Sequence, residues 1–196
     1  MNQIYISSGP GSFTGLRIAV TIAKVMHIAN QKIKIAAVDT LDCIASNIIE
    51  AQRHKGTEEQ SYKGNKEIKR IASILDAKRG QFFIAVYKRR NVCKDQDNFF
   101  ECWDKIVDDC LMTAKQFVEQ CVGGDEQVWL LGEGLVYYKK DFEAKGISFI
   151  DERFWTPRAS KVFYLGRSLA HNKCFSEALT VVPKYILRPE IKIKNR

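Results

Sequence analysis

The residues whose types and spacing could do chemistry lie in a glycine-rich turn near the start of the chain. The candidates to surround an anion are Gly9, Gly11, Ser12, Thr14 and Gly15. Glycine permits backbone angles and close approaches that a side chain forbids, and serine is a suitable helix N-cap. Such a turn directs free N–H groups and the positive end of a helix dipole at one point, where a phosphate or carboxylate could bind. The alternative is a tight strand-to-helix connection without a ligand.

The elements on either side must position this turn. A short apolar run at residues 4–6 leads into it, and a segment of helical period follows it to about Asn30, which predicts strand, loop and helix. The turn is not a Walker A loop, because Gly15 is followed by Leu16 and Arg17 rather than by Lys and then Ser or Thr.

The predicted helix carries two apolar stripes, whereas a surface helix needs only one. One side holds Leu16, Ala19, Val20, Ala23 and Met26, and the other holds Ile18, Ile22, Val25 and Ala29. The second stripe must be covered by another element of this chain or by another protein, unless the whole helix is buried in a core.

Composition limits the classes of protein to consider. A chain of 196 residues with 45% hydrophobic side chains can form one large domain or two small lobes. The net charge of +8 suggests an acidic partner such as RNA, although short basic clusters are commonly solvated. The 6 cysteines show no C-x-x-C spacing, which favours free thiols over a zinc site or a redox pair. Without a signal peptide or an apolar run of transmembrane length, we expect a cytoplasmic protein that is not bound to a membrane.

The chain divides once, at a polar stretch from residue 54 to residue 69. Before it, a strand at 32–38 and a helix capped by Thr40 repeat the strand–helix order, so we expect parallel pairing. After it, we expect a β-hairpin whose turn spans Asp76 to Gly80, with Gly80 in the left-handed conformation. The later elements are expected as a strand at 99–107, a helix at 113–122, strands at 128–131 and 147–150, helices at 134–145 and from Pro157, and an extended tail from Ala178.

Residues 9–18, with the sequence GPGSFTGLRI, resemble the signature of the bacterial TsaB (YeaZ) family. Two further matches follow in the expected order, at residues 38–41 (VDTL) and 75–80 (LDAKRG), and a weaker one lies at 182–188 (VPKYILR). The resemblance implies an α/β protein of the actin-like (ASKHA), RNase-H-like type with two lobes. Residues 1–69 would form a partial N-terminal lobe and linker, and residues 70–196 a C-terminal lobe with an extended tail. Family members carry further strands and a helix before the element at 4–6, so the first lobe is expected to be incomplete.

The resemblance also implies a function. The TsaB family is a non-catalytic paralogue of TsaD, so this chain would be a scaffold or activator subunit that pairs with TsaD and the ATPase TsaE. Together these proteins make threonylcarbamoyladenosine (t6A) in tRNA, which the chain would meet only through the complex. No metal, catalytic residue or cofactor of its own is expected, and ATP or ADP at the interface of the complex is left open. The candidates for the partner interface are Phe13, Leu16, Arg17, Val20, Ala23, Lys24 and His27.

Two hypotheses that assign the chain to other functional classes remain open. In an actin-like ATPase or kinase fragment, Asp76 would be the acid near the γ-phosphate and the glycines at 132 and 134 could approach an adenine or ribose. Asp76 could equally be a turn residue that binds its own backbone. TsaD carries a paired-histidine metal motif, whereas His27, His54 and His171 are too far apart in sequence to form one. The other reading is a stand-alone basic RNA-binding module.

Overall fold

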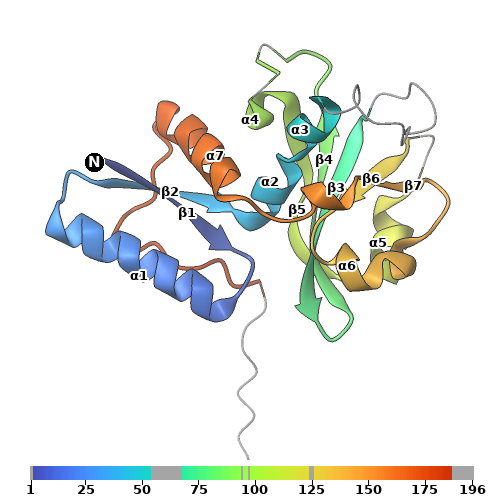
Figure 1. The fold of residues 1–196 in the computed structure, drawn as a ribbon, viewed down its shortest axis with the longest axis horizontal. Coiled ribbons are helices and arrows are strands. Elements are labelled where there is room, and N and C mark those ends of the chain that lie inside the picture. Colours follow the sequence, from blue (N-terminus) through green and yellow to red (C-terminus); the bar gives the residue numbers. More distant parts are fainter. Residues whose placement is uncertain (1, 54–67, 94, 97, 124–125, 187–196) are drawn as a thin grey trace, which may run out of the picture.

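The computed structural model describes residues 2–53, 68–93, 95–96, 98–123 and 126–186, which form two lobes, each built on its own sheet (Figure 1). The smaller lobe holds β1 (Gln3–Gly9) and β2 (Lys34–Asp39), which pair in parallel across the helix α1 (Phe13–Ala29). The strand, turn and helix expected at the N-terminus, and the parallel pairing, are therefore confirmed.

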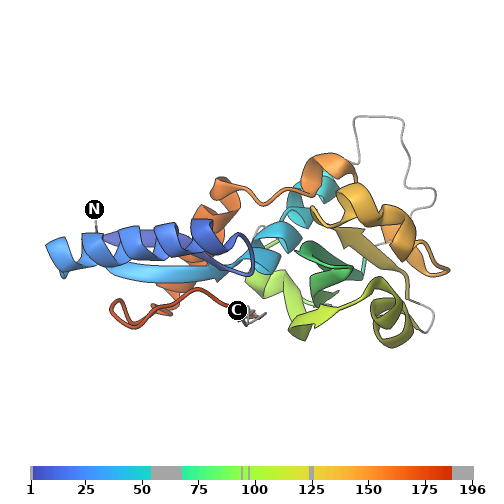
Figure 2. The ribbon, with the colours of Figure 1, turned by 90° about the horizontal axis from the view of Figure 1, so that it is seen from below.

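The two-stranded sheet lies between α1 and α7 (Ala159–His171), as Figures 1 and 2 show. Neighbouring residues of a strand point to opposite faces. Accordingly, Ile6 packs with Val20 and Ala23 of α1, whereas the ring of Tyr5 contacts α7. Each face of this small sheet thus has one helix.

The start of α1 follows from its sequence. Ser12 is the N-cap, and its hydroxyl accepts a hydrogen bond from the Gly15 amide at 3.3 Å. The buried residues of the helix are Leu16, Val20 and Ala23, whose spacing of four and three places them on one stripe against the sheet.

The larger lobe has a five-stranded sheet in the order β5-β4-β3-β6-β7. The hairpin of β3 (Arg70–Lys78) and β4 (Gln81–Arg89) is antiparallel, and the φ of Gly80 is +70°, as expected. The other strands are β5 (Trp103–Met112), β6 (Val128–Leu131) and β7 (Ile147–Phe149). The helical segments are α2 (Thr40–Ala45), α3 (Ile48–Arg53), α4 (Phe99–Cys102), α5 (Ala114–Cys121), α6 (Leu135–Tyr138), and the 3-10 turns η2 (Lys139–Phe142) and η3 (Glu152–Phe154).

Helices connect the two lobes. Although α2 and α3 follow β2 in the chain, Leu41 and Ile48 belong to the main core with the five-stranded sheet. The Ser73 hydroxyl of β3 donates to the Leu41 carbonyl at 2.8 Å. In the other direction, α7 returns from the larger lobe to cover β1 and β2 (Figure 1). A boundary after residue 69 therefore separates the two sheets, while helices from each side cross it.

Three sequence expectations need correction. Thr40 is the first residue of α2 and Asp39 its N-cap, without a side-chain cap bond, because the Asp39 carboxylate pairs with lysines instead. The helix expected at 134–145 ends at Tyr138 and continues as η2, which buries Phe142. The strand expected at 99–107 begins as helix α4 and is extended only from Trp103. Most of the polar stretch at 54–69 lies outside the described residues.

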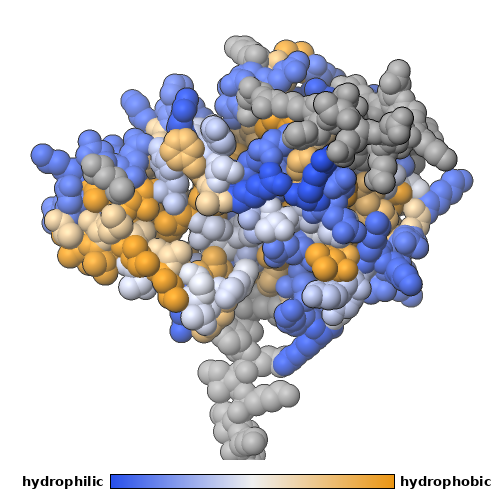
Figure 3. Space-filling model, in the orientation of Figure 1, coloured by the Kyte–Doolittle hydropathy of each residue, from blue (hydrophilic) through white to orange (hydrophobic). Residues whose placement is uncertain are grey.

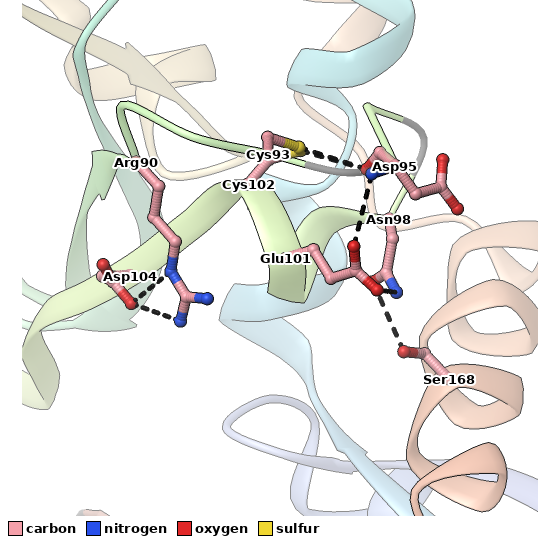
Figure 4. Close-up of a disulfide and its surroundings, with 8 residues drawn as sticks. All are labelled: Arg90, Cys93, Asp95, Asn98, Glu101, Cys102, Asp104 and Ser168. Carbon is pink, nitrogen blue, oxygen red and sulfur yellow. Dashed lines mark hydrogen bonds and ion pairs between the residues drawn. A yellow bond between two sulfur atoms is a disulfide. The ribbon is translucent and has the colours of Figure 1, made fainter.

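Two cysteines form a disulfide, so the expectation of free thiols was wrong for them (Figure 4). Cys93 and Cys102 have Cα atoms 5.0 Å apart, since the connection between β4 and β5 folds back on itself. An ion pair joins Arg90, at the start of this connection, to Asp104 of β5. Cys43, Cys110, Cys121 and Cys174 are free. A disulfide requires proximity in space rather than a C-x-x-C spacing, which is why the sequence pattern missed it.

Breaking this disulfide should destabilise the protein. The double variant Cys93→Ala/Cys102→Ala removes a closed loop of about ten residues, and we expect the free energy of unfolding to fall by about 2–3 kcal/mol. Urea unfolding with and without a thiol reductant measures this directly. Cys174→Ala, at an exposed free cysteine, is the matched control and should leave the midpoint unchanged. A wild-type midpoint that does not respond to the reductant would contradict the assignment.

Candidate functional site

The glycine turn is held by the chain's own C-terminal tail. Gly9 has a φ of +115°, and a Cβ at this position would lie 2.9 Å from the carbonyl oxygen of Lys184. The Lys184 amide donates to the Ser8 carbonyl at 2.7 Å. Gly9 is therefore required by both its backbone angle and its neighbour, whereas a Cβ on Gly11 would meet open space.

The tail also contacts the start of α1. The ring of Tyr185 lies 5.4 Å from the ring of Phe13, and its hydroxyl accepts a hydrogen bond from Arg17 Nε at 3.1 Å. The Arg17 guanidinium stacks 3.8 Å above the Phe13 ring. Thr14 is exposed and Ser12 is engaged as the helix cap. Anion binding at the turn stays a prediction, and any anion would have to share the turn with residues 184 and 185.

A charged cluster lies beside the turn, where the two lobes meet. Carboxylate oxygens of Asp39, Asp42 and Asp109 lie within 4.8 Å of one another. Lys105 Nζ is 2.6 Å from Asp42, 2.8 Å from Asp109 and 3.5 Å from Asp39. Lys184 Nζ is 2.7 Å from Asp39 and 2.8 Å from Asp109. Two ammonium groups thus neutralise most of the charge of three carboxylates that could otherwise gather round a cation.

Burial sets the protonation behaviour of this cluster. Desolvation raises the pKa of Asp42, although Lys105 opposes it, and Tyr87 donates to this carboxylate at 2.7 Å. Desolvation also raises the pKa of the Tyr87 hydroxyl well above its ordinary value. For Lys105, desolvation lowers the pKa, but attraction to Asp42 and bonds to Asp109 outweigh it, so the pKa is raised. The same balance, with Asp109 and Asp39, raises the pKa of Lys184.

The residues proposed for a partner interface divide between core and surface. Leu16, Val20 and Ala23 are buried against the chain's own sheet, so they cannot contact a partner, and their assignment to an interface is corrected. Phe13 and Arg17 are exposed, while Lys24 and His27 are half-buried. His27 Nδ1 lies 2.7 Å from the Ile33 carbonyl oxygen, which is a structural contact within the lobe.

The second apolar stripe of α1 is on the surface. Four aliphatic side chains are more than half exposed, namely Ile18 (54%), Ile22 (54%), Val25 (57%) and Ile28 (64%). Figure 3 shows hydrophobic side chains gathered along α1 on the smaller lobe. We call these four residues the α1 face. The sequence pattern already contained three of them, but helical period alone could not say which stripe the sheet covers.

The other candidate positions have structural partners. Asp76 accepts a hydrogen bond from the Lys78 amide at 2.7 Å, and its carboxylate lies 2.6 Å from Lys78 Nζ. It therefore makes the local turn interactions expected of an aspartate in a hairpin. A Cβ on Gly132 would lie 2.1 Å from the Ile74 carbonyl oxygen, and the Gly134 amide donates to that same oxygen at 3.1 Å. These glycines thus allow the chain after β6 to pass close to β3. In the described ranges, no helix is long and apolar enough to cross a membrane.

Comparisons with known proteins agree on one family. The family described as TsaD, tRNA N6-adenosine threonylcarbamoyltransferase, matches residues 1–193. The tRNA threonylcarbamoyladenosine biosynthesis protein TsaB of Bacillus subtilis (strain 168) is 28% identical over 198 residues, which cover 99% of this chain and 73% of that protein.

Solved structures agree on the fold. The structure of YeaZ from Pseudomonas aeruginosa has a TM-score of 0.68 at 19% identity, covering 94% of this chain and 74% of that one. A second structure, titled as an uncharacterized protein with similarity to peptidase YEAZ from the same organism, has a TM-score of 0.70 at 19% identity and covers 95% and 74%. These two structures show that the chain shares the fold of YeaZ, and with the family match they agree with the actin-like, RNase-H-like fold expected from the sequence.

Removing Lys105 should destabilise the protein in a pH-dependent way. In Lys105→Met the carboxylates of Asp42 and Asp109 lose their shared cation, and we expect a loss of about 2–4 kcal/mol at pH 7. Acidification should reduce this loss, because burial raises the pKa of the Asp42 carboxyl, which then takes up a proton and no longer needs a cation. Urea unfolding of the wild type and the variant, at pH values from about 4 to about 8, measures how this loss of stability depends on pH.

The stability of the wild type should fall at high pH, where the two lysines lose their charge. The raised pKa values of Lys105 and Lys184 mean that their stabilising effect is complete below the ordinary lysine pKa of 10.5 and is lost as the pH rises through the folded values. Lys115→Met, at an exposed lysine on α5, is the control. Equal losses for Lys105→Met and Lys115→Met would show that the cluster does not hold the lobes together.

Proposed function

We propose a function from one premise, that the chain belongs to the TsaB (YeaZ) family within the wider TsaD family of tRNA N6-adenosine threonylcarbamoyltransferases. The curated relative is named as a tRNA threonylcarbamoyladenosine biosynthesis protein, which supports a role for this chain in the same biosynthesis. Its finer role, in our proposal, is that of a non-catalytic subunit that pairs with TsaD, and through that pair with TsaE and tRNA in the cytoplasm.

The α1 face is the observation that carries this proposal. Four branched aliphatic side chains stand more than half exposed on one helix, on the side opposite the stripe that the chain's own sheet buries. Full burial of such a side chain contributes about 1.5–3 kcal/mol, so a partner that covers the face would gain substantially. TsaD is the partner that the family relationship favours. ATP or ADP at the interface of that complex remains part of the proposal.

The acidic side chains support a scaffold rather than an enzyme. Asp76 is engaged by the Lys78 amide and ammonium, and the three carboxylates between the lobes are engaged by Lys105 and Lys184. An acid that orients a metal and a water at a γ-phosphate needs free lone pairs directed into a cleft. The contacts of these carboxylates are instead with the chain itself.

A charge placed on the α1 face should abolish pairing. In Ile22→Asp a carboxylate replaces a half-exposed aliphatic side chain, so the fold should persist while the interface loses its apolar contact. We expect co-purification of tagged TsaD with this chain to fall by at least about tenfold, and t6A formation by the reconstituted proteins to fall with it.

Val136→Asp is the matched control. Val136 is a branched aliphatic residue of the larger lobe, and its exposed fraction of 56% is close to the 54% of Ile22. Its variant should pair with TsaD as the wild type does. Wild-type chain that fails to capture TsaD under conditions where the Bacillus subtilis relative succeeds would overturn the proposed function.

ATP hydrolysis tests the non-catalytic part of the proposal. The purified chain should show no hydrolysis that depends on Asp76, because this carboxylate is bound by Lys78. The measurement compares phosphate release by the wild type and by Asp76→Ala. Release that the substitution abolishes would favour the actin-like ATPase instead.

A further inference from the structure

A second surface of the smaller lobe combines aromatic rings with basic groups. It lies on the other side of the sheet from α1 and is formed by α7 and the first halves of β1 and β2. We call it the α7 surface, and its members are Tyr5, Lys34, Phe163, Tyr164 and Arg167. Phe163 and Tyr164 are 49% and 60% exposed, so both rings present much of their area to solvent.

Ring contacts join three of these residues, and helical period and sheet register place the other two on the same side of the lobe. The rings of Tyr5 and Phe163 lie 5.8 Å apart, and those of Phe163 and Tyr164 lie 5.6 Å apart. Arg167 is exposed one helical turn after Phe163. The sheet register pairs Gln3 with Lys34, and Tyr5 donates a hydrogen bond to Gln3, so Lys34 is on the same face as Tyr5.

The segments that form this surface carry basic but no acidic residues. The sequence has no Asp or Glu at residues 1–38 or at residues 153–176, which include β1, most of β2 and all of α7. Arg158 and Lys161, at the start of α7, are paired with Glu50. Neither Lys34 nor Arg167 makes an ion pair with any acidic residue in the described ranges, and Lys34 instead lies 4.9 Å above the ring of Phe175.

We propose that the α7 surface binds the unpaired bases of an RNA loop. Flat aromatic rings can stack on any base, and nearby lysine and arginine groups attract the phosphates between the bases. An apolar protein segment would match the rings but not two cations without counter-charges. The proposal rests on the proposed function, because it assigns a contact surface for the tRNA of t6A biosynthesis. The α1 face on the opposite side of the sheet stays open for a protein partner.

Binding of labelled RNA to the full chain tests the proposal. The probes are a stem–loop RNA with a seven-nucleotide loop, about the size of an anticodon loop, and a blunt duplex of the same length. We expect tighter binding of the stem–loop, and Tyr164→Ala or Phe163→Ala should weaken it by about tenfold. Arg167→Gln and Lys34→Gln should each lower the slope of log affinity against log salt by about 0.7, whereas Arg167→Lys should preserve the slope.

Matched controls lie in the larger lobe. The controls are Tyr137→Ala, at a tyrosine that is 86% exposed, and Lys145→Gln, at an exposed lysine. Neither variant should change the affinity for the stem–loop RNA. The urea midpoint of each variant is compared with that of the wild type to confirm that the variant folds. If Phe163→Ala is destabilised, the test relies on Tyr164→Ala, because Tyr164 is the more exposed residue. Stem–loop affinity that is indifferent to Tyr164 and Arg167 would overturn the proposal.

Capture of TsaD by the same variants separates the two hypotheses. If Ile22→Asp loses TsaD but keeps RNA binding, and Tyr164→Ala does the reverse, both stand. If the wild type never captures TsaD while the α7 variants lose RNA, the proposed function fails and the RNA surface stands. If the α7 variants lose TsaD but not RNA, the surface belongs to a protein partner and the RNA proposal fails.

Discussion

Lys184 and Lys105 hold together three segments that the backbone does not join locally. The end of β2 contributes Asp39, β5 contributes Lys105 and Asp109, and the tail contributes Lys184. The Asp109 side chain is only 1% exposed, so an unpaired charge there would be costly. Two ammonium groups among three carboxylates therefore stabilise one arrangement of the lobes. The tail that carries Lys184 also places Tyr185 against the start of α1.

This arrangement explains the shape of the glycine turn. The backbone of Lys184 fills the space that a side chain at Gly9 would need, and its amide satisfies the Ser8 carbonyl. The Ser12 hydroxyl caps the first turn of α1 by accepting a hydrogen bond from the Gly15 amide. The conformation of this turn is thus stabilised by contacts within the chain.

Most of the fold could be predicted from the sequence, because its elements carry strong local signals. The alternating run at 32–38, the Asp76 to Gly80 hairpin and the cap at Ser12 all form where they were expected. The disulfide and the cluster of Asp39, Asp42 and Asp109 could not be predicted, because their members are brought together by tertiary packing. Lys105 and Asp109, four residues apart on a strand, share one face, but no pattern indicates that Lys184 joins them from the tail.

The two sides of the smaller lobe differ in the chemistry that they offer. The α1 face is aliphatic, so its gain on binding comes from removing apolar area from water and carries little dependence on salt. The α7 surface combines exposed rings with Lys34 and Arg167, so its attraction for phosphate groups is weakened by salt. Since a sheet of only two strands separates the helices α1 and α7, a protein and an RNA could occupy the lobe together without competing for side chains. A small lobe covered on each face by one helix is therefore suited to joining two partners of unlike chemistry, which is the physical requirement for a scaffold.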